Sequence, residues 1–213
     1  LMFYGRGAEN RLSRRDGYCI VTLSWVFFTL FGMLPFYLSG SIDSLTNAFF
    51  ETMSGFTTTG ATILDDIESL SHGMLFWRSL TQWIGGLGIV FFTIAVLPAF
   101  TSGGVQLFSA ESTGVTHDRT HPKINVMAKW LWTVYLILTL AETILLMLGG
   151  MSLFDAVCQS FATTATGGYS TKQASISYWN SPFIEYVVAI FMLLSGVNFA
   201  LFLMCLRGKV SRL

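Results

Sequence analysis

Charged side chains are scarce in this sequence of 213 residues, of which only 11% are Asp, Glu, Lys or Arg. A soluble domain usually carries about 25% charged residues. The deficit, with 53% hydrophobic residues, excludes an ordinary soluble domain and favours an all-α polytopic membrane protein. The net charge is zero and no basic-aromatic stripe is present, so nucleic acid is not expected as a partner.

Cysteine is also rare, and the three cysteines Cys19, Cys158 and Cys205 are far apart in sequence. A disulfide framework or a cysteine metal site is therefore not predicted. The first apolar run is too long for a cleavable signal peptide and lacks a small-residue cleavage site. Because the sequence starts at Leu1 and stops soon after an apolar segment, we interpret it as part of a longer chain.

Long apolar segments are present in four places, each near the 20 or so residues that cross a bilayer. They are roughly 18–38, 76–97, 130–148 and 183–206. Two shorter segments, Ser44–Phe56 and Ser152–Thr164, lie within the first and second pair of spans. Thirteen residues of helix reach only about 20 Å, which predicts half-helices that enter the membrane and turn back. Ser44 and Ser152 are expected to cap them, and Asp155 is expected to complete a capping box.

The basic residues predict the orientation of the spans. Ten of the twelve Lys and Arg residues fall before the first span, between the second and third, or after the fourth. The positive-inside rule makes these segments and the start of the chain cytoplasmic, so both half-helices enter from the outer face. Of the two remaining basic residues, Lys172 lies outside, and Arg78 is expected to extend its head group to the outer interface.

A shift of 108 residues aligns the two halves without a gap, although only five of nineteen residues are identical over 44–62. The order of segments repeats as well. We predict two tandem units of transmembrane helix, re-entrant pore helix, filter strand and transmembrane helix. The predicted parts are a cytoplasmic basic segment 1–16, a first repeat 17–100, a cytoplasmic loop 101–127, a second repeat 128–206 and a cytoplasmic stub 207–213.

Each half-helix is followed by a short segment rich in threonine and glycine. The residues are Thr57, Thr58, Thr59, Gly60 and Ala61 in the first repeat, and Ala165, Thr166, Gly167, Gly168 and Tyr169 in the second. Irregular backbone at membrane depth is tolerated only where protein or a water-filled cavity surrounds it. Carbonyls lining such a cavity replace the hydration shell of an ion. With no carboxylate in either segment, a monovalent cation held by the main-chain oxygens of Thr58, Thr59, Thr166 and Gly167 is predicted.

Two acidic residues within apolar segments are expected to have structural roles. Glu51, in the middle of the first half-helix, is expected to bond behind the filter. Glu142 lies inside the third span, where an ionisable group faces the bundle interior, and a partner on a neighbouring helix is expected for it.

Other motifs point to packing rather than chemistry. The run Trp83–Gly88 lacks the spacing of a dinucleotide loop, and its glycines, like Gly196, suit close helix packing. His117 and His121 lack further zinc ligands, so solvation in a cytoplasmic loop is favoured. Ser54-Gly55 and Ser195-Gly196 lack the nucleophile elbow, and no histidine lies in a predicted span. An enzyme with catalytic residues is therefore not predicted, and an intramembrane enzyme or a membrane scaffold stays the weaker alternative.

The longest motifs resemble a known family. Phe49–Thr62 resembles the first pore loop of bacterial TrkH/TrkG potassium transporters, and Gln82–Ile89 resembles the helix after it. Phe154–Thr171 resembles the second pore loop, and Ser195–Asn198 the helix that follows. The second segment reads Thr-Gly-Gly-Tyr where a potassium channel has Thr-Val-Gly-Tyr.

The resemblance implies four repeats around one pore, of which this sequence holds two. It implies K⁺ as the transported ion, no covalently bound cofactor, a bacterial inner membrane, a homodimer, and a cytosolic TrkA-like nucleotide-binding regulatory subunit. The alternative is a two-repeat monovalent-cation channel subunit that completes its pore by dimerisation.

Overall fold

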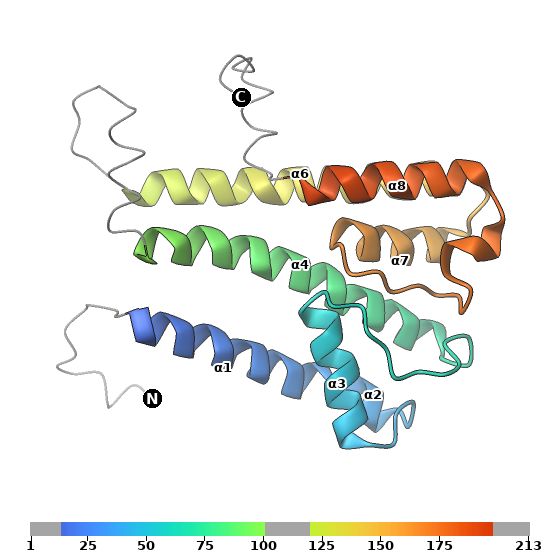
Figure 1. Ribbon diagram of the computed structural model, residues 1–213, viewed down its shortest axis with the longest axis horizontal. Helices are drawn as coiled ribbons and strands as arrows, with labels where there is room; N and C mark the ends of the chain where they lie inside the picture. Colours follow the sequence, from blue (N-terminus) through green and yellow to red (C-terminus); the bar gives the residue numbers. More distant parts are fainter. Residues whose placement is uncertain (1–13, 101–119, 198–213) are drawn as a thin grey trace, which may run out of the picture.

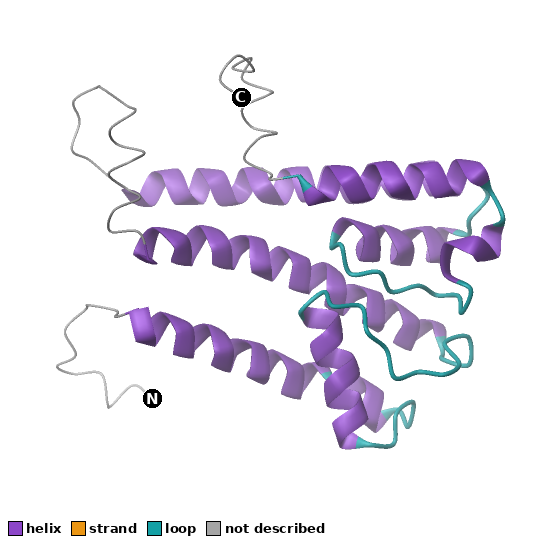
Figure 2. Ribbon diagram, viewed as in Figure 1, coloured by secondary structure: helices purple, strands orange, loops and turns teal. Residues whose placement is uncertain are grey.

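The computed structural model describes the backbone of residues 14–100 and 120–197 and the side chains of residues 18–88 and 129–197. Most of the predicted segments 1–16 and 101–127, all of the predicted stub 207–213 and the end of the second repeat from residue 198 lie outside these residues, as do His117 and the side chain of His121. The expectation of a loop as far as residue 127 is wrong at its end, because the helix that follows already begins at Thr120. The described part is helical and contains no strand (Figure 2). The elements are α1 (Arg14–Gly32), α2 (Leu34–Leu38), α3 (Leu45–Phe56), α4 (His72–Phe100), α6 (Thr120–Leu148), α7 (Leu153–Thr164), the 3₁₀ helix η1 (Ser175–Trp179) and α8 (Pro182–Gly196).

The two half-helices form as predicted, as α3 and α7, and each contains 12 residues. The hydroxyl of Ser44 accepts a hydrogen bond from the main-chain N–H of Asn47, and that of Ser152 accepts one from the N–H of Asp155. These bonds satisfy donors that have no partner inside the helix. Ser152 also donates to the Asp155 carboxylate at 2.7 Å, so the pair forms a variant of the predicted capping box.

The long helices α1, α4 and α6 run side by side (Figure 1). The half-helices α3 and α7 lie beside only one end of this group. The start of α1, the end of α4 and the start of α6 lie together at the left, while both half-helices lie at the right. Two candidate spans, Tyr18–Leu38 and Lys129–Leu148, are long and apolar enough to cross a membrane among the residues described. The first is divided at Met33, because Pro35 in the first turn of α2 lacks an N–H to continue the helix α1.

The apolar core is divided between the two repeats. The larger cluster joins α6, α7 and α8 and includes Leu146, Ala156 and Ile184, all fully buried. The smaller cluster joins α2 and α3 around Phe36 and Ala48. Ala48 and Ala156 occupy the same position in their half-helices, and their small size lets each half-helix approach its neighbours closely. A third cluster, of Ile67, Leu70 and Leu75 in the first repeat, packs against Phe154 of the second, so apolar side chains also contribute to the contact between the repeats.

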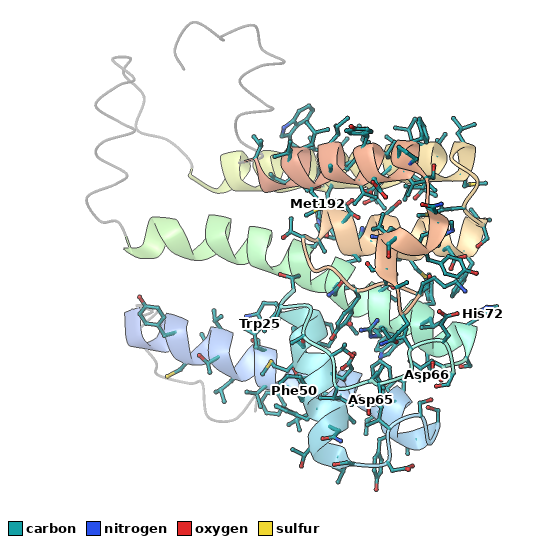
Figure 3. All side chains as sticks on the ribbon, turned by 45° about the vertical axis from the view of Figure 1, so that its right-hand side comes forward. Trp25, Phe50, Asp65, Asp66, His72 and Met192 are labelled. Carbon is teal, nitrogen blue, oxygen red and sulfur yellow. The ribbon has the colours of Figure 1, made fainter. Side chains whose placement is uncertain are left out.

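The outer loops of the two repeats contact each other through polar groups. Lys172 Nζ lies 3.3 Å from Glu68 Oε2, and the main-chain N–H of Gln173 donates to the other oxygen of Glu68. Partial burial lowers the pKa of Lys172, but the hydrogen bond and charge of Glu68 outweigh it and leave that pKa raised. Asp65, Asp66 and His72 lie at this end of the molecule, away from the start of α1 (Figure 3).

Candidate ion filter

Both threonine- and glycine-rich segments leave their half-helices through the same hydrogen bonds. The N–H of Thr58 bonds to the Gly55 carbonyl, and the N–H of Thr59 bonds to the Ser54 carbonyl. In the second repeat Thr166 and Gly167 make the equivalent bonds to Thr163 and Ala162, 108 residues further on. This is the Schellman pattern of helix ends, and after it the chain is irregular rather than helical. Neither segment belongs to a continuous membrane-crossing helix.

Four residues of these segments have left-handed backbone conformations. Thr58 and Thr166 have φ of 53° and 55°, and Gly60 and Gly168 have φ of 76° and 85°. Glycine adopts this conformation without steric cost, as predicted for Gly60 and Gly168. A β-branched residue is an outlier there and carries strain of about 1–3 kcal/mol. Threonine nevertheless stands at the helix end where glycine is usual, at the same position of both repeats.

The two segments meet at Gly60 and Gly167. A Cβ atom built on Gly60 would overlap the carbonyl oxygen of Gly167, so no side chain fits at this point. Gly60 therefore needs to be glycine for two reasons, its positive φ and the contact with the opposite segment. In contrast, a Cβ on Gly168 would meet no described atom within 4 Å, so only its backbone conformation requires glycine there.

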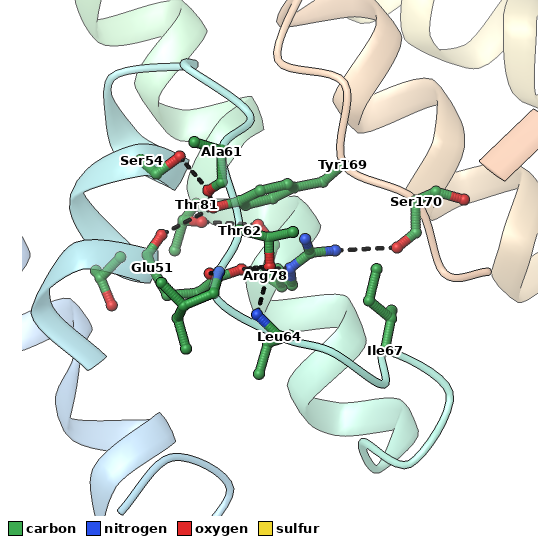
Figure 4. A network of polar contacts seen from close by, with 12 residues as sticks. Glu51, Ser54, Ala61, Thr62, Leu64, Ile67, Arg78, Thr81, Tyr169 and Ser170 are labelled. Atoms are coloured by element: carbon green, nitrogen blue, oxygen red, sulfur yellow. Dashed lines mark hydrogen bonds and ion pairs between the residues drawn. The ribbon is translucent and has the colours of Figure 1, made fainter. Parts of the chain in front are cut away.

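Glu51 holds the chain that follows the first segment, as predicted. Its carboxylate accepts hydrogen bonds from the hydroxyl of Thr62 at 2.9 Å and from the main-chain N–H of Ile63 at 3.0 Å (Figure 4). Ser54 adds a 2.6 Å bond to the Ala61 carbonyl. The half-helix α3 and the returning chain are therefore joined along their length.

Arg78 does not extend to the interface, and that expectation is wrong. Its side chain is 2% exposed, and Nε donates to Glu51 Oε1 at 2.7 Å. Its Nη1 donates to the carbonyl of Ser170 at 3.0 Å, so one guanidinium on α4 bonds to both repeats (Figure 4). The physical reason is that a buried carboxylate needs a compensating charge, and Arg78 lies close enough to Glu51 to supply it.

Tyr169 turns its side chain away from the segment to which it belongs and into the first repeat. Its hydroxyl donates to the carbonyls of Glu51 at 2.9 Å and Ala61 at 3.2 Å. The guanidinium carbon of Arg78 lies 3.6 Å from the centre of its ring. The N–H of Tyr169 bonds to the side-chain oxygen of Gln82 on α4. The second segment is thus fixed on three sides by the first repeat.

The second repeat anchors its own chain by a different residue. Gln159 occupies the position of Glu51, 108 residues later, but its Oε1 is buried without a hydrogen-bond partner in the described part. Instead, the carboxylate of Asp155 at the start of α7 accepts a 2.7 Å bond from the hydroxyl of Thr171. The carboxylate that caps the half-helix therefore also holds the chain beyond the second segment.

Glu142 faces the neighbouring helix on which its partner was expected. The side chain is fully buried on α6, and the hydroxyls of Thr163 and Thr164 on α7 are its polar neighbours, although neither carboxylate oxygen has a hydrogen bond of ordinary geometry among the residues described here. It lies behind the last turn of α7, where hydroxyls from the two helices bond to each other: Thr139 to Thr164 and Thr143 to Ser160.

The glycines of α4 serve packing, as predicted. A Cβ on Gly85 would overlap the main chain at Phe56, and one on Gly86 would lie 3.0 Å from Ala165. Gly88 faces Trp25 on α1. These contacts bring α4 against the ends of both half-helices. Gly196 has no described atom within 4 Å of its Cβ position, so its predicted packing is not found in this part of the chain.

Some site residues could not be found from sequence motifs. Arg78 lies seven residues before Gly85 and Gln82 lies three before it, so the two are four residues apart, the spacing of neighbours on one helix face. That spacing and the polarity of both residues in an apolar span were the available signals. Neither reveals which atoms they contact, because their partners lie up to 92 residues away.

Comparisons with known proteins agree with this architecture. The TrkH family, described as cation transport protein, matches residues 3–212. The chain is 44% identical over 211 residues to the Trk system potassium uptake protein TrkH of Escherichia coli strain K12, covering 98% of this chain and 44% of that protein. It is 37% identical over 204 residues to TrkG of the same strain, covering 95% of this chain and 42% of that protein.

A solved structure is also similar. The crystal structure of the potassium transporter TrkH from Vibrio parahaemolyticus matches with a TM-score of 0.77 and 40% identity, over 91% of this chain and 38% of that chain. The chain thus spans less than half the length of these relatives. They are transporters and not enzymes, in agreement with the prediction. On the match across nearly all of its length, this chain belongs to the TrkH family of cation transport proteins.

Proposed function

We propose that this chain supplies two quarters of a carbonyl-lined filter through which a bacterial inner-membrane protein takes up K⁺. One observation carries the proposal. The main-chain carbonyl oxygens of residues 57–60 and 165–168 accept no hydrogen bond from any described residue. Unpaired carbonyls at membrane depth cost several kcal/mol each unless they line a water-filled path or hold an ion.

The backbone conformation supports a filter with its carbonyls on one side. Left-handed residues at 58 and 60 alternate with Thr59, whose φ is negative, and those at 166 and 168 alternate with Gly167. In a uniformly extended chain, successive carbonyls point to opposite sides. When left-handed and right-handed backbone conformations alternate, successive carbonyls point to the same side. The strain at Thr58 and Thr166 is explained by this need to turn the carbonyls to one side. The threonine hydroxyls are additional oxygen ligands for a hard cation.

Electrostatics favours a cation at this place. Both segments follow directly from the C-terminal ends of α3 and α7, where the helix dipole is negative. No residue of either segment carries a charge. The carboxylate of Glu51 is neutralised by Arg78 and serves the scaffold rather than the ion. The assignment of K⁺ rather than Na⁺ follows the names of the relatives, which are potassium uptake proteins.

Two pore loops cannot enclose a dehydrated ion. We infer that two further loops complete the filter and that they belong to the same polypeptide, since the relatives are more than twice as long as this chain. The homodimer and the TrkA-like nucleotide-binding regulatory subunit stay proposals from the family resemblance. If a second copy of the two repeats completed the pore instead, residues 1–213 alone would conduct in planar bilayers.

The test is rubidium uptake by the full-length protein in cells lacking their own potassium transporters. Gly60→Ser places a side chain against the Gly167 carbonyl at a position with positive φ, and uptake should fall to background. Gly73→Ser is the matched control, because a Cβ there meets nothing within 4 Å. Normal uptake by Gly60→Ser at equal abundance in the membrane would rule out the filter.

A further inference from the structure

Gln82 lies behind the point where the two candidate filter segments meet. It is on α4 of the first repeat, and its side chain is fully buried. Its Oε1 accepts a 3.1 Å hydrogen bond from the main-chain N–H of Tyr169 in the second segment. Its Nε2 has no hydrogen-bond partner in the described part of the chain. A buried amide with a free donor is costly, so its retention at this place needs a reason.

The carboxamide of Gln82 fills the space beside Gly167. A Cβ atom built on Gly167 would stand 2.6 Å from both Nε2 and Oε1 of Gln82, which is closer than real contacts allow. The same Nε2 lies 3.9 Å from the Cβ position of Gly60 in the opposite segment. One side chain from α4 therefore bonds to the second segment and lies near the first at Gly60.

The reason that position 167 is glycine differs from the reason at 60 or 168. Gly167 is not among the residues with positive φ, so its backbone conformation would accept any residue. Only the space taken by Gln82 excludes a side chain there. The carboxamide of Gln82 stands where the side chain of a filter residue would otherwise pack.

The second repeat has no counterpart of Gln82. The residue 108 positions later is Ile190 on α8, which is 54% exposed and apolar. A glutamine carboxamide packed behind a filter glycine is therefore found where the first repeat meets the second, and it is not repeated at the equivalent position of the second repeat.

We propose that Gln82 is a specificity-determining residue of the filter. It sets the position of the Gly167 carbonyl by filling the space behind it and by holding the next N–H of the chain at Tyr169. The inference rests on the proposed function and adds to it. Ions that differ by a few tenths of an ångström in radius are separated only if the carbonyls hold their spacing, and packed side chains behind the backbone resist such small shifts.

The free Nε2 donor fits the same role. It lies beside Gly60, whose own segment offers unpaired carbonyls at residues 57–60. The carboxamide occupies the space between α4 and the meeting point of the two segments, and this packing resists displacement of the segments toward α4.

The experiment measures the ratio of rubidium to sodium uptake by the full-length protein in the same preparation of proteoliposomes. This ratio does not depend on how much protein is inserted. Gln82→Leu removes the bond to Tyr169 and the free donor at similar volume. The ratio should fall about three- to tenfold, the factor that corresponds to the loss of one hydrogen bond. Ile190→Leu is the matched control and should keep the ratio of the parent protein.

A second pair of variants separates the role of Gln82 from a loss of folding. Gly167→Ala should lower the ratio strongly, because its Cβ would overlap the carboxamide. In the Gln82→Ala background that space is empty, so Gly167→Ala should change the ratio little or restore part of it. Equal effects of Gly167→Ala in both backgrounds, or a parental ratio in Gln82→Leu, would overturn the proposal. Failure of the parent protein to take up rubidium at all would refute the proposed function instead.

Discussion

The guanidinium carbon of Arg78 lies 3.6 Å from the centre of the Tyr169 ring, and this contact joins the two repeats at the candidate filter. Arg78 is on the helix that closes the first repeat, and Tyr169 ends the filter segment of the second. The same arginine neutralises Glu51, which in turn holds the chain after the first segment. Both segments are thus held by one buried polar cluster.

Tyr169→Phe is expected to destabilise the full-length protein. The substitution removes the hydroxyl that donates to the carbonyls of Glu51 and Ala61 and leaves the ring in place. The loss should be about 1–3 kcal/mol, since buried carbonyls are left with fewer donors. The measurement is the thermal midpoint of the purified protein in detergent. Tyr178→Phe, at a half-exposed tyrosine of η1, should leave the midpoint unchanged, and equal shifts in the two variants would contradict this role of Tyr169.

Arg78→Met is expected to cost about 3–5 kcal/mol, because it leaves the carboxylate of Glu51 buried without its charge partner. The double variant Arg78→Met with Glu51→Met should cost less than the sum of the two single variants. Thermal midpoints of the four proteins form the double-mutant cycle. Lys172→Met provides the comparison, since its ion pair with Glu68 is partly exposed and such pairs contribute about 0–1 kcal/mol. Additive effects at Arg78 and Glu51 would show that the ion pair does not couple them.

Thr58→Gly is expected to raise stability while lowering uptake. Glycine relieves the left-handed strain of a β-branched residue, about 1–3 kcal/mol, against an entropic cost of about 0.5–1 kcal/mol. Uptake should fall because the threonine hydroxyl is lost. Thr59→Gly is the control, since Thr59 has negative φ and gains nothing from glycine. Thermal midpoint and rubidium uptake are measured on the same variants, and a lower midpoint for Thr58→Gly than for Thr59→Gly would show that no strain is stored at Thr58.

Glu142→Gln is expected to leave the thermal midpoint unchanged or to raise it. The polar neighbours of this buried carboxyl are the uncharged hydroxyls of Thr163 and Thr164, which an amide of the same shape can also meet, and the amide avoids an uncompensated charge. Glu51→Gln is the comparison, because that carboxylate has three donors and should lose stability. A strong destabilisation by Glu142→Gln would indicate a charged partner in a part of the protein beyond the described residues.

The local structure of this chain could be predicted from its sequence because it depends on neighbouring residues. The half-helices begin at Ser44 and Ser152, as their capping side chains predicted, and end where threonine and glycine follow. Apolar length predicted the long helices α1, α4 and α6, whereas the fourth predicted span is described as a helix only over Pro182–Gly196. The left-handed conformations of Gly60 and Gly168 followed from the residue type itself.

Only the tertiary structure decided how the two segments are held together. The sequence placed Arg78 at the interface and treated Tyr169 as a filter residue alone, whereas folding joins both to Glu51 in one buried cluster. It also gave no reason for the glycine at 167, which depends on the side chain of Gln82, 85 positions earlier in the chain. The partners of a buried charge and the space beside a glycine depend on residues distant in sequence, so no local pattern specifies them.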